Sequence, residues 1–460
     1  MNFPGRLRVC AAVCALFCTG VASLRADIVG QWNDYALTLA REAGMSSPEL
    51  SRLMAMLNIS IYNAVEGIAG DYELYTHGSY TGPSGTALPG ASMQAAAATA
   101  AHTLLYSLYG SNASIVTSIN ALYSSQMDLL PDDQARLDGL SFGYLVASDI
   151  YAWRNTDGAA DAASTPYTPL GTAGHWGPTP PDYEDAALPG WGSVATFAIS
   201  GTAPYAGSLG MSNTAWMTTA EYTSQFNNVK DLGSATSGTR TAEQTDAAYF
   251  WEGAPGTITN IGLWNNVAAG IVSANGLSLQ DTARLYAALN VTLADAAIVA
   301  WDTKYAVDLW SPISAIRDAD VDGNAGTAQD AGWQSLLNAP NSPSYFAEQA
   351  IFGAAAAGIL EAFAGTSYAF TLGSDTDGDG IVDITLNFSS LAAARDMAVL
   401  SGLWGGIYFE RALADSATSG SQLADAVLGS QFAAVPEPSG LLLLAVSGLV
   451  AARRRRRVRS

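Results

Sequence analysis

The sequence predicts an all-α protein, built as one large helical body with a long wrapping loop region and one small β-hairpin. Hydrophobic residues make up 49% of the 460 residues, which is enough for a buried core. Apolar positions recur with a helical period through most of the chain, which indicates amphipathic helices. Alternating apolar positions, the pattern of strands, occur in two short runs at 368–372 and 381–388.

The first 26 residues have the pattern of a cleaved secretory signal peptide, which implies signal peptidase as a partner. Arg6 and Arg8 precede an apolar run at 9–21, and Ala26 is a suitable last residue before the cleaved bond. All three cysteines of the chain lie in this segment, so the mature protein contains no thiol. This excludes disulfide scaffolds, zinc sites made of cysteines and cysteine nucleophiles.

Periodic helical segments follow within residues 27–434, which we expect to form a single domain. The segments are 32–43, 48–68, 92–109, 132–153, 241–251, 258–274, 279–304, 343–364 and 391–413. Gly139 and Gly143 lie four residues apart on one helix face, which suits close helix packing. They also match the GxSxG nucleophile elbow, but that motif needs a strand before its turn, so we expect no serine hydrolase.

Residues 155–240 are irregular and form the predicted wrapping loop region. They contain the sequences WGPTPP at 176–181 and PGWG at 189–192. Loops of this length in a compact body are either functional or wrap its surface. We expect wrapping, with the tryptophans as packing anchors.

An aspartate-rich loop joins the two strands of the predicted hairpin. Positions 1, 3, 5 and 9 of a calcium-loop pattern are occupied by Asp375, Asp377, Asp379 and Asp383. Gly380 occupies position 6, but position 12 is Leu386 and lacks the bidentate glutamate of an EF-hand. The pattern favours a weak, non-helical Ca²⁺ site that orders the hairpin, and the alternative is a solvated acidic turn.

The chain ends in a tripartite tail that starts with Val435, Pro436, Glu437, Pro438 and Ser439. Apolar or small residues follow at 440–452, and then five arginines at 453–457. The apolar run reaches about 20 Å as a helix, short of the roughly 30 Å of a bilayer core. The tail, 435–460, resembles the PEP-CTERM sorting signal. This resemblance implies export from a Gram-negative bacterium, a transient inner-membrane tail, processing by an exosortase, and release to the cell surface or extracellular matrix.

The composition is strongly acidic, with 41 acidic and 20 basic side chains and a formal net charge of −21. Binding to nucleic acid requires cations that contact phosphates. We therefore expect no nucleic-acid partner, and we expect extracellular matrix or cell-surface components instead.

Several segments between residues 32 and 427 together resemble the bacterial vanadium-dependent haloperoxidases, relatives of the type 2 phosphatidic acid phosphatases. They are the AHTLL segment at 101–105, the helix with Gly139 and Gly143, the WGPTPP and PGWG segments and, above all, WDTKY at 301–305. The resemblance implies an all-α fold of helical bundles that bury an oxyanion pocket for vanadate or phosphate.

The pocket of that family uses a lysine, two arginines, a serine, a glycine amide and two histidines around the oxyanion. The corresponding positions here are Lys304, Ser311, Ala347, Glu348, Gln349, Gly402 and Tyr408. Only Lys304 keeps the family's residue type, and no histidine follows His175. We therefore expect that vanadate does not bind, and we assign no catalytic residue.

Two arrangements around Lys304 remain open from the sequence. In the first, the old pocket is filled by a polar network around Lys304 that consists of Glu348, Gln349, Tyr408 and Ser311. In the second, Lys304 pairs with Asp308 one helical turn further on, and Glu348 points to solvent.

The sequence is compatible with three functions. The first is an exported, exosortase-sorted surface or matrix protein whose haloperoxidase-like domain has lost catalysis. The second is an active haloperoxidase or acid phosphatase-like enzyme with an atypical oxyanion pocket. The third is binding of a small ligand in the vacated pocket.

Overall fold

The computed structural model describes residues 27–254 and 256–436. The predicted signal peptide, 1–26, and the sorting tail from Glu437 onward lie outside the described residues. Within the described part, the chain forms a helical body with one two-stranded antiparallel sheet. The all-α fold class predicted from the sequence is therefore confirmed.

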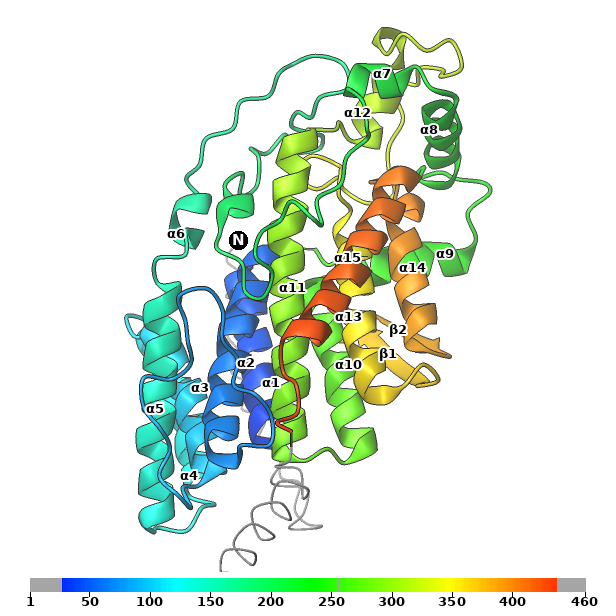
Figure 1. Ribbon diagram of the computed structural model, residues 1–460. Coiled ribbons are helices and arrows are strands. Elements are labelled where there is room, and N and C mark those ends of the chain that lie inside the picture. The colour runs from blue at the N-terminus through cyan, green and yellow to red at the C-terminus, as the bar shows by residue number, and fades with distance from the viewer. Residues whose placement is uncertain (1–26, 255, 437–460) are drawn as a thin grey trace, which may run out of the picture.

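A long central helix, α11 (Leu279–Val307), lies between two groups of helices (Figure 1). The first group contains α1 (Asp27–Ala43), α2 (Ser47–Ala69), α3 (Met93–Tyr109), α4 (Ala113–Met127) and α5 (Gln134–Arg154). The second contains α10 (Thr259–Asn275), α13 (Glu348–Ala364), α14 (Leu391–Trp404) and α15 (Glu410–Ser430). In length and hydropathy α11 alone of the described helices is able to span a membrane, but nearly all of it is buried in the protein, as in a core helix.

Short elements complete the fold. They are α6 (Ala159–Ala162), η1 (Trp191–Ser193), α7 (Asn213–Met217), α8 (Ala220–Leu232), α9 (Ala242–Phe250), α12 (Pro312–Arg317) and η2 (Ala319–Val321). Strands β1 (Phe370–Ser374) and β2 (Ile384–Phe388) pair antiparallel, with Phe370 opposite Phe388 and Ser374 opposite Ile384. The hairpin predicted from the alternating runs is confirmed.

Helix α5 packs closely on α3 because glycine lines its inner face. A side chain at Gly139 would collide with the backbone oxygen of Ser92, and one at Gly143 with that of Ala96. Ser141, between them, is exposed and donates a hydrogen bond to the backbone oxygen of Leu137. The GxSxG sequence is thus a packing motif inside a helix and not a nucleophile elbow.

Three sequence predictions about helices need correction. The segment predicted as 343–364 is helical only from Glu348, because the chain before it forms bends and is held beside the end of α11 by the hydrogen bond from Ser344 N to Leu309 O. The segment predicted as 391–413 is two helices, separated near Gly406, whose φ of 76° is unfavourable for other residues. The predicted loop region 155–240 contains α8, a helix of 13 residues.

The loop region nevertheless wraps the body, and its tryptophans are packing anchors as predicted. Trp176, Trp191 and Trp216 are each at most 3% exposed. The segment 195–199 is held by Asp295, a fully buried residue in the middle of α11. Its carboxylate accepts hydrogen bonds from the backbone nitrogens of Phe197, Ala198 and Ile199.

Candidate functional site

Lys304 is buried near the C-terminal end of α11, and its ammonium group has three polar neighbours. It donates hydrogen bonds to the backbone oxygen of Pro343 at 3.0 Å and to the Tyr408 hydroxyl at 3.4 Å. It also lies 3.8 Å from a carboxylate oxygen of Glu348, the first residue of α13. The rings of Trp301 and Tyr408 face the ammonium with centroids at 5.6 and 5.2 Å.

The electrostatics of this site are dominated by loss of water. Burial lowers the pKa of Lys304 to about 8, although the nearby Glu348 carboxylate acts in the opposite direction. Burial also raises the pKa of Glu348, and the Lys304 charge limits that rise. The pKa of Tyr408 is raised by burial and by the charge of Glu348, so this hydroxyl stays protonated.

Asp308 is not the partner of Lys304. Its carboxylate accepts a hydrogen bond from the Tyr167 hydroxyl at 2.5 Å and lies 2.9 Å from Nδ1 of His175. Glu348 does not point wholly to solvent either, since only 18% of its side chain is exposed. Of the two arrangements left open by the sequence, the structure contains the pair of Lys304 and Glu348.

The remaining family positions do not join this pair. The Ser311 hydroxyl is buried and has no hydrogen-bond partner among the described residues. Gln349 donates to the backbone oxygen of Glu252, 3.4 Å away. The backbone nitrogen of Ala347 is bound by the hydroxyl of Ser416. The network proposed from the sequence is therefore smaller than expected, with Tyr408 as its third member.

Gly402 helps to position Tyr408, through hydrogen bonds of its backbone. Its carbonyl oxygen accepts hydrogen bonds from the backbone nitrogens of Ile407 and Tyr408, which close the turn between α14 and α15. A side chain built on Gly402 would meet the ring of Tyr408 at 2.8 Å. The family's arginine at this position has no room while tyrosine occupies the position of the family's metal-binding histidine.

The three histidines lie elsewhere. His175 contacts Asp308, His102 lies 2.8 Å from the side-chain oxygen of Asn120, and His77 is beside Thr196. No contact between any of them and Lys304 is present in the described residues. His102 is hydrogen-bonded, as expected, but it is half-buried rather than deep in the core.

A cavity of about 320 Å³ opens beside the charged pair. Its walls come from α2, the wrapping loop, the end of α9, α11 and the segment before α13. The acidic residues that line it are Asp182, Glu184, Glu252 and Glu348. Sequence reasoning missed Glu252, which follows the buried Phe250 and Trp251 at the end of α9; a carboxylate directly after two buried aromatic residues was the only signal for it.

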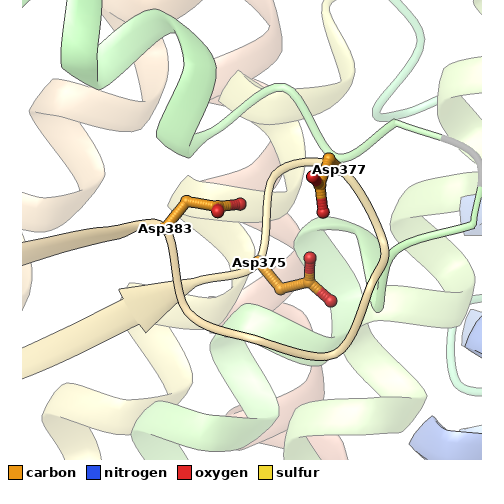
Figure 2. A group of neighbouring side chains, drawn as sticks. All are labelled: Asp375, Asp377 and Asp383. Atoms are coloured by element: carbon orange, nitrogen blue, oxygen red, sulfur yellow. The ribbon is translucent and has the colours of Figure 1, made fainter.

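The aspartate loop forms a second candidate site (Figure 2). Carboxylate oxygens of Asp375, Asp377 and Asp383 lie within 4.8 Å of one another. Asp379, predicted as a fourth ligand, is outside this group and accepts a hydrogen bond from Ile381 N. The guanidinium of Arg41 lies 3.9 Å from Asp375 and supplies part of the neutralising charge.

The helical fold is similar to that of known proteins. Residues 284–435 match the family model described as the VCPO second helical-bundle domain. Among solved structures, a bacterial vanadium-dependent iodoperoxidase is similar with 22% identity and a TM-score of 0.73, over 90% of this chain and 98% of that chain. The holo form of a bacterial vanadium-dependent chloroperoxidase is similar with 17% identity and a TM-score of 0.63, over 84% of this chain and 94% of that chain. The curated proteins gave no match to the chain.

Proposed function

We propose that this chain, whose fold is similar to that of vanadium-dependent haloperoxidases, is a non-catalytic scaffold exported to the cell surface or extracellular matrix. The observation that carries the proposal is the pair of Lys304 and Glu348. The one cation retained from the family's oxyanion pocket is already neutralised by a carboxylate of the same chain.

Vanadate does not fit the residues present. A vanadate oxyanion needs several cations and hydrogen-bond donors, and an imidazole to bind the metal. Here a second anion would lie against Glu348, and no histidine contacts Lys304 within the described residues. We therefore assign no reaction step to vanadate in this chain.

The proposed location is supported by the two ends of the sequence. The basic and apolar pattern of residues 1–26 favours export, and the tail at 435–460 resembles an exosortase-processed sorting signal. In this proposal the helical body reaches its place without its terminal segments and contacts matrix or cell-surface components. The acidic composition suits such a soluble, exposed domain.

We also propose that the aspartate loop binds Ca²⁺ and so orders the hairpin. Three converging carboxylates repel one another unless a cation lies between them, which supports this assignment. The role is structural, because the loop joins β1 to β2 and does not line the cavity beside Lys304.

The test is calorimetric titration of the mature chain, residues 27–434, with orthovanadate, followed by assays of bromide and iodide oxidation with hydrogen peroxide. We expect no saturable binding of vanadate up to millimolar concentration and no halide oxidation above the protein-free rate. A variant with Ser311→Arg and Tyr408→His but with Glu348 intact should also fail to bind vanadate. Micromolar binding by the natural chain, together with halide oxidation or phosphatase activity, would overturn the proposal and establish an active enzyme with an atypical pocket.

A further inference from the structure

We propose that the cavity beside Lys304 binds a small organic cation that carries a primary ammonium group. This goes beyond the scaffold function, because it gives the cavity next to the family's oxyanion position a ligand of opposite charge to that of the family. Three features of the cavity favour such a ligand: the charge of its walls, one carboxylate without a partner, and three buried polar atoms without hydrogen bonds.

The charged side chains that line the cavity are all acidic. Four acidic side chains line it, and among the described lining residues there is no lysine, arginine or histidine. Lys304 lies just beyond, fully buried behind Glu348, and is already paired with that residue. The cavity therefore favours cations and repels anions.

Glu252 is the strongest single element of the site. Its side chain is half-buried, and among the described residues its carboxylate has no ion pair and no hydrogen-bond donor. Burial alone raises its pKa. A partly desolvated carboxylate without a partner favours a cation beside it, so an ammonium group in the cavity would pair with a group that the protein leaves unpaired.

Three polar side-chain atoms in the same walls also lack partners. They are Oε1 of Gln349, Oγ1 of Thr179 and Oγ of Ser342, whose residues are 3%, 3% and 2% exposed. Buried polar atoms in native proteins are almost always hydrogen-bonded, so three unpaired ones around one cavity indicate a polar guest. Trp301 adds an aromatic wall, which suits an organic cation.

A metal ion fits these walls less well than an organic cation. Metal binding requires oxygen atoms that converge on one point. In the described part of the chain, three acidic residues converge in this way only in the aspartate loop. The acids of the cavity are spread over its walls, so a ligand that spans about 320 Å³ and carries hydrogen-bonding groups besides its charge fits better.

The experiment is calorimetry of the mature chain with two amine probes, putrescine and glucosamine, and with neutral N-acetylglucosamine as the control ligand. We expect saturable binding of at least one amine near one equivalent and none of N-acetylglucosamine. Glu252→Gln should weaken amine binding about tenfold or more, because it removes the unpaired charge and keeps the shape. Asp425→Asn removes an equal charge from an exposed position outside the cavity and should leave binding unchanged.

A second variant separates binding from stability. Thr179→Val removes a hydroxyl that has no partner, so the fold should be retained while amine affinity falls severalfold. Glu252→Gln should likewise be at least as stable as the natural chain at neutral pH, because an unpaired carboxylate has been removed. The proposal is overturned if neither amine binds saturably at millimolar concentration, or if both cavity variants bind the amines as tightly as Asp425→Asn does. Its failure leaves the scaffold proposal intact, because that proposal depends on vanadate and halide assays.

Discussion

The opposite charges of Lys304 and Glu348 offset part of the free-energy cost of burying each group. Lys304 is fully buried and Glu348 nearly so, yet their charged atoms are 3.8 Å apart and not in direct hydrogen-bond contact. Burial lowers the pKa of the amine to about 8 and raises that of the acid, which shows that desolvation outweighs attraction in both groups. The Glu348 carboxylate offsets the charge of Lys304, but the two residues are not an optimised ion pair.

This balance predicts how the pair responds to substitution. Lys304→Met leaves a largely buried carboxylate without its cation and should lower the free energy of unfolding by about 2–4 kcal/mol at pH 7. Lys304→Met combined with Glu348→Met removes both charges and should recover most of that loss. Urea unfolding of the two variants and the natural chain measures both effects. A single variant as stable as the natural chain would show that the pair does not compensate the burial of Glu348.

The free energies of unfolding of the natural chain and of Lys304→Met should also differ in their pH dependence. The pKa of Lys304 is about 8 in the folded chain and about 10.5 in the unfolded chain, so between these values the unfolded chain holds more protons. The contribution of this residue to stability therefore rises as the pH increases from about 8 to 10. The natural chain should gain about 1 kcal/mol or more over Lys304→Met in that window.

At the scale of the elements, the β-hairpin carries the aspartate loop, whose clustered negative charges we propose bind Ca²⁺. Carboxylate oxygens of Asp375, Asp377 and Asp383 lie within 4.8 Å of one another, and Asp379 is outside this group. We expect Asp377→Ala to weaken Ca²⁺ binding at least about tenfold, from a natural affinity near the millimolar range of extracellular modules. Asp379→Ala is the matched control and should have the smaller effect. Calorimetric titration with calcium chloride measures both, and an unchanged affinity in Asp377→Ala would contradict the site.

The elements that the sequence predicted well are those whose pattern is local. Helices α2, α3 and α11 have long apolar stripes and clear starts, and the close packing of α5 was visible in the spacing of Gly139 and Gly143. The start of α13 was not predictable, because the segment before it is fixed by contacts with Lys304 and Leu309, which are distant in the sequence. Helix α4 was missed because most of its residues are exposed, and α8 because it has only 13 residues and lies within an otherwise irregular region.

Some features of the candidate site were likewise predictable from the sequence, and others were not. The residue types at the seven positions that correspond to the family's pocket are read directly from the sequence, and that only Lys304 keeps the family's type needs no structure. The pairing of Lys304 with Glu348 rather than Asp308 was not predictable, since it depends on how α13 lies against the end of α11. Glu252 and Asp295 were missed for the same reason, because what each carboxylate faces is decided by segments far away in the sequence.

At the scale of the whole molecule, the wrapping loop joins the helical groups and closes the cavity. Residues 179–187 of the loop contribute to the cavity wall, and residues 195–199 are fastened to α11. Arg154, at the end of α5, donates hydrogen bonds to the backbone oxygens of Ala195 and Thr196 in the same stretch. The central helix and the first helical group thus hold one short segment of the loop from two sides.

Asp295 is the residue on which this attachment depends. Asp295→Asn keeps the size of the side chain but turns an amide donor toward backbone nitrogens that need acceptors, which leaves at least one buried donor unpaired. We expect the free energy of unfolding to fall by about 1–3 kcal/mol, and limited proteolysis to cut first within residues 155–211. Asp185→Asn changes an exposed aspartate of the same loop and should leave both measurements unchanged. If Asp295→Asn is cut no faster than Asp185→Asn, the loop is held by its tryptophans and not by this carboxylate.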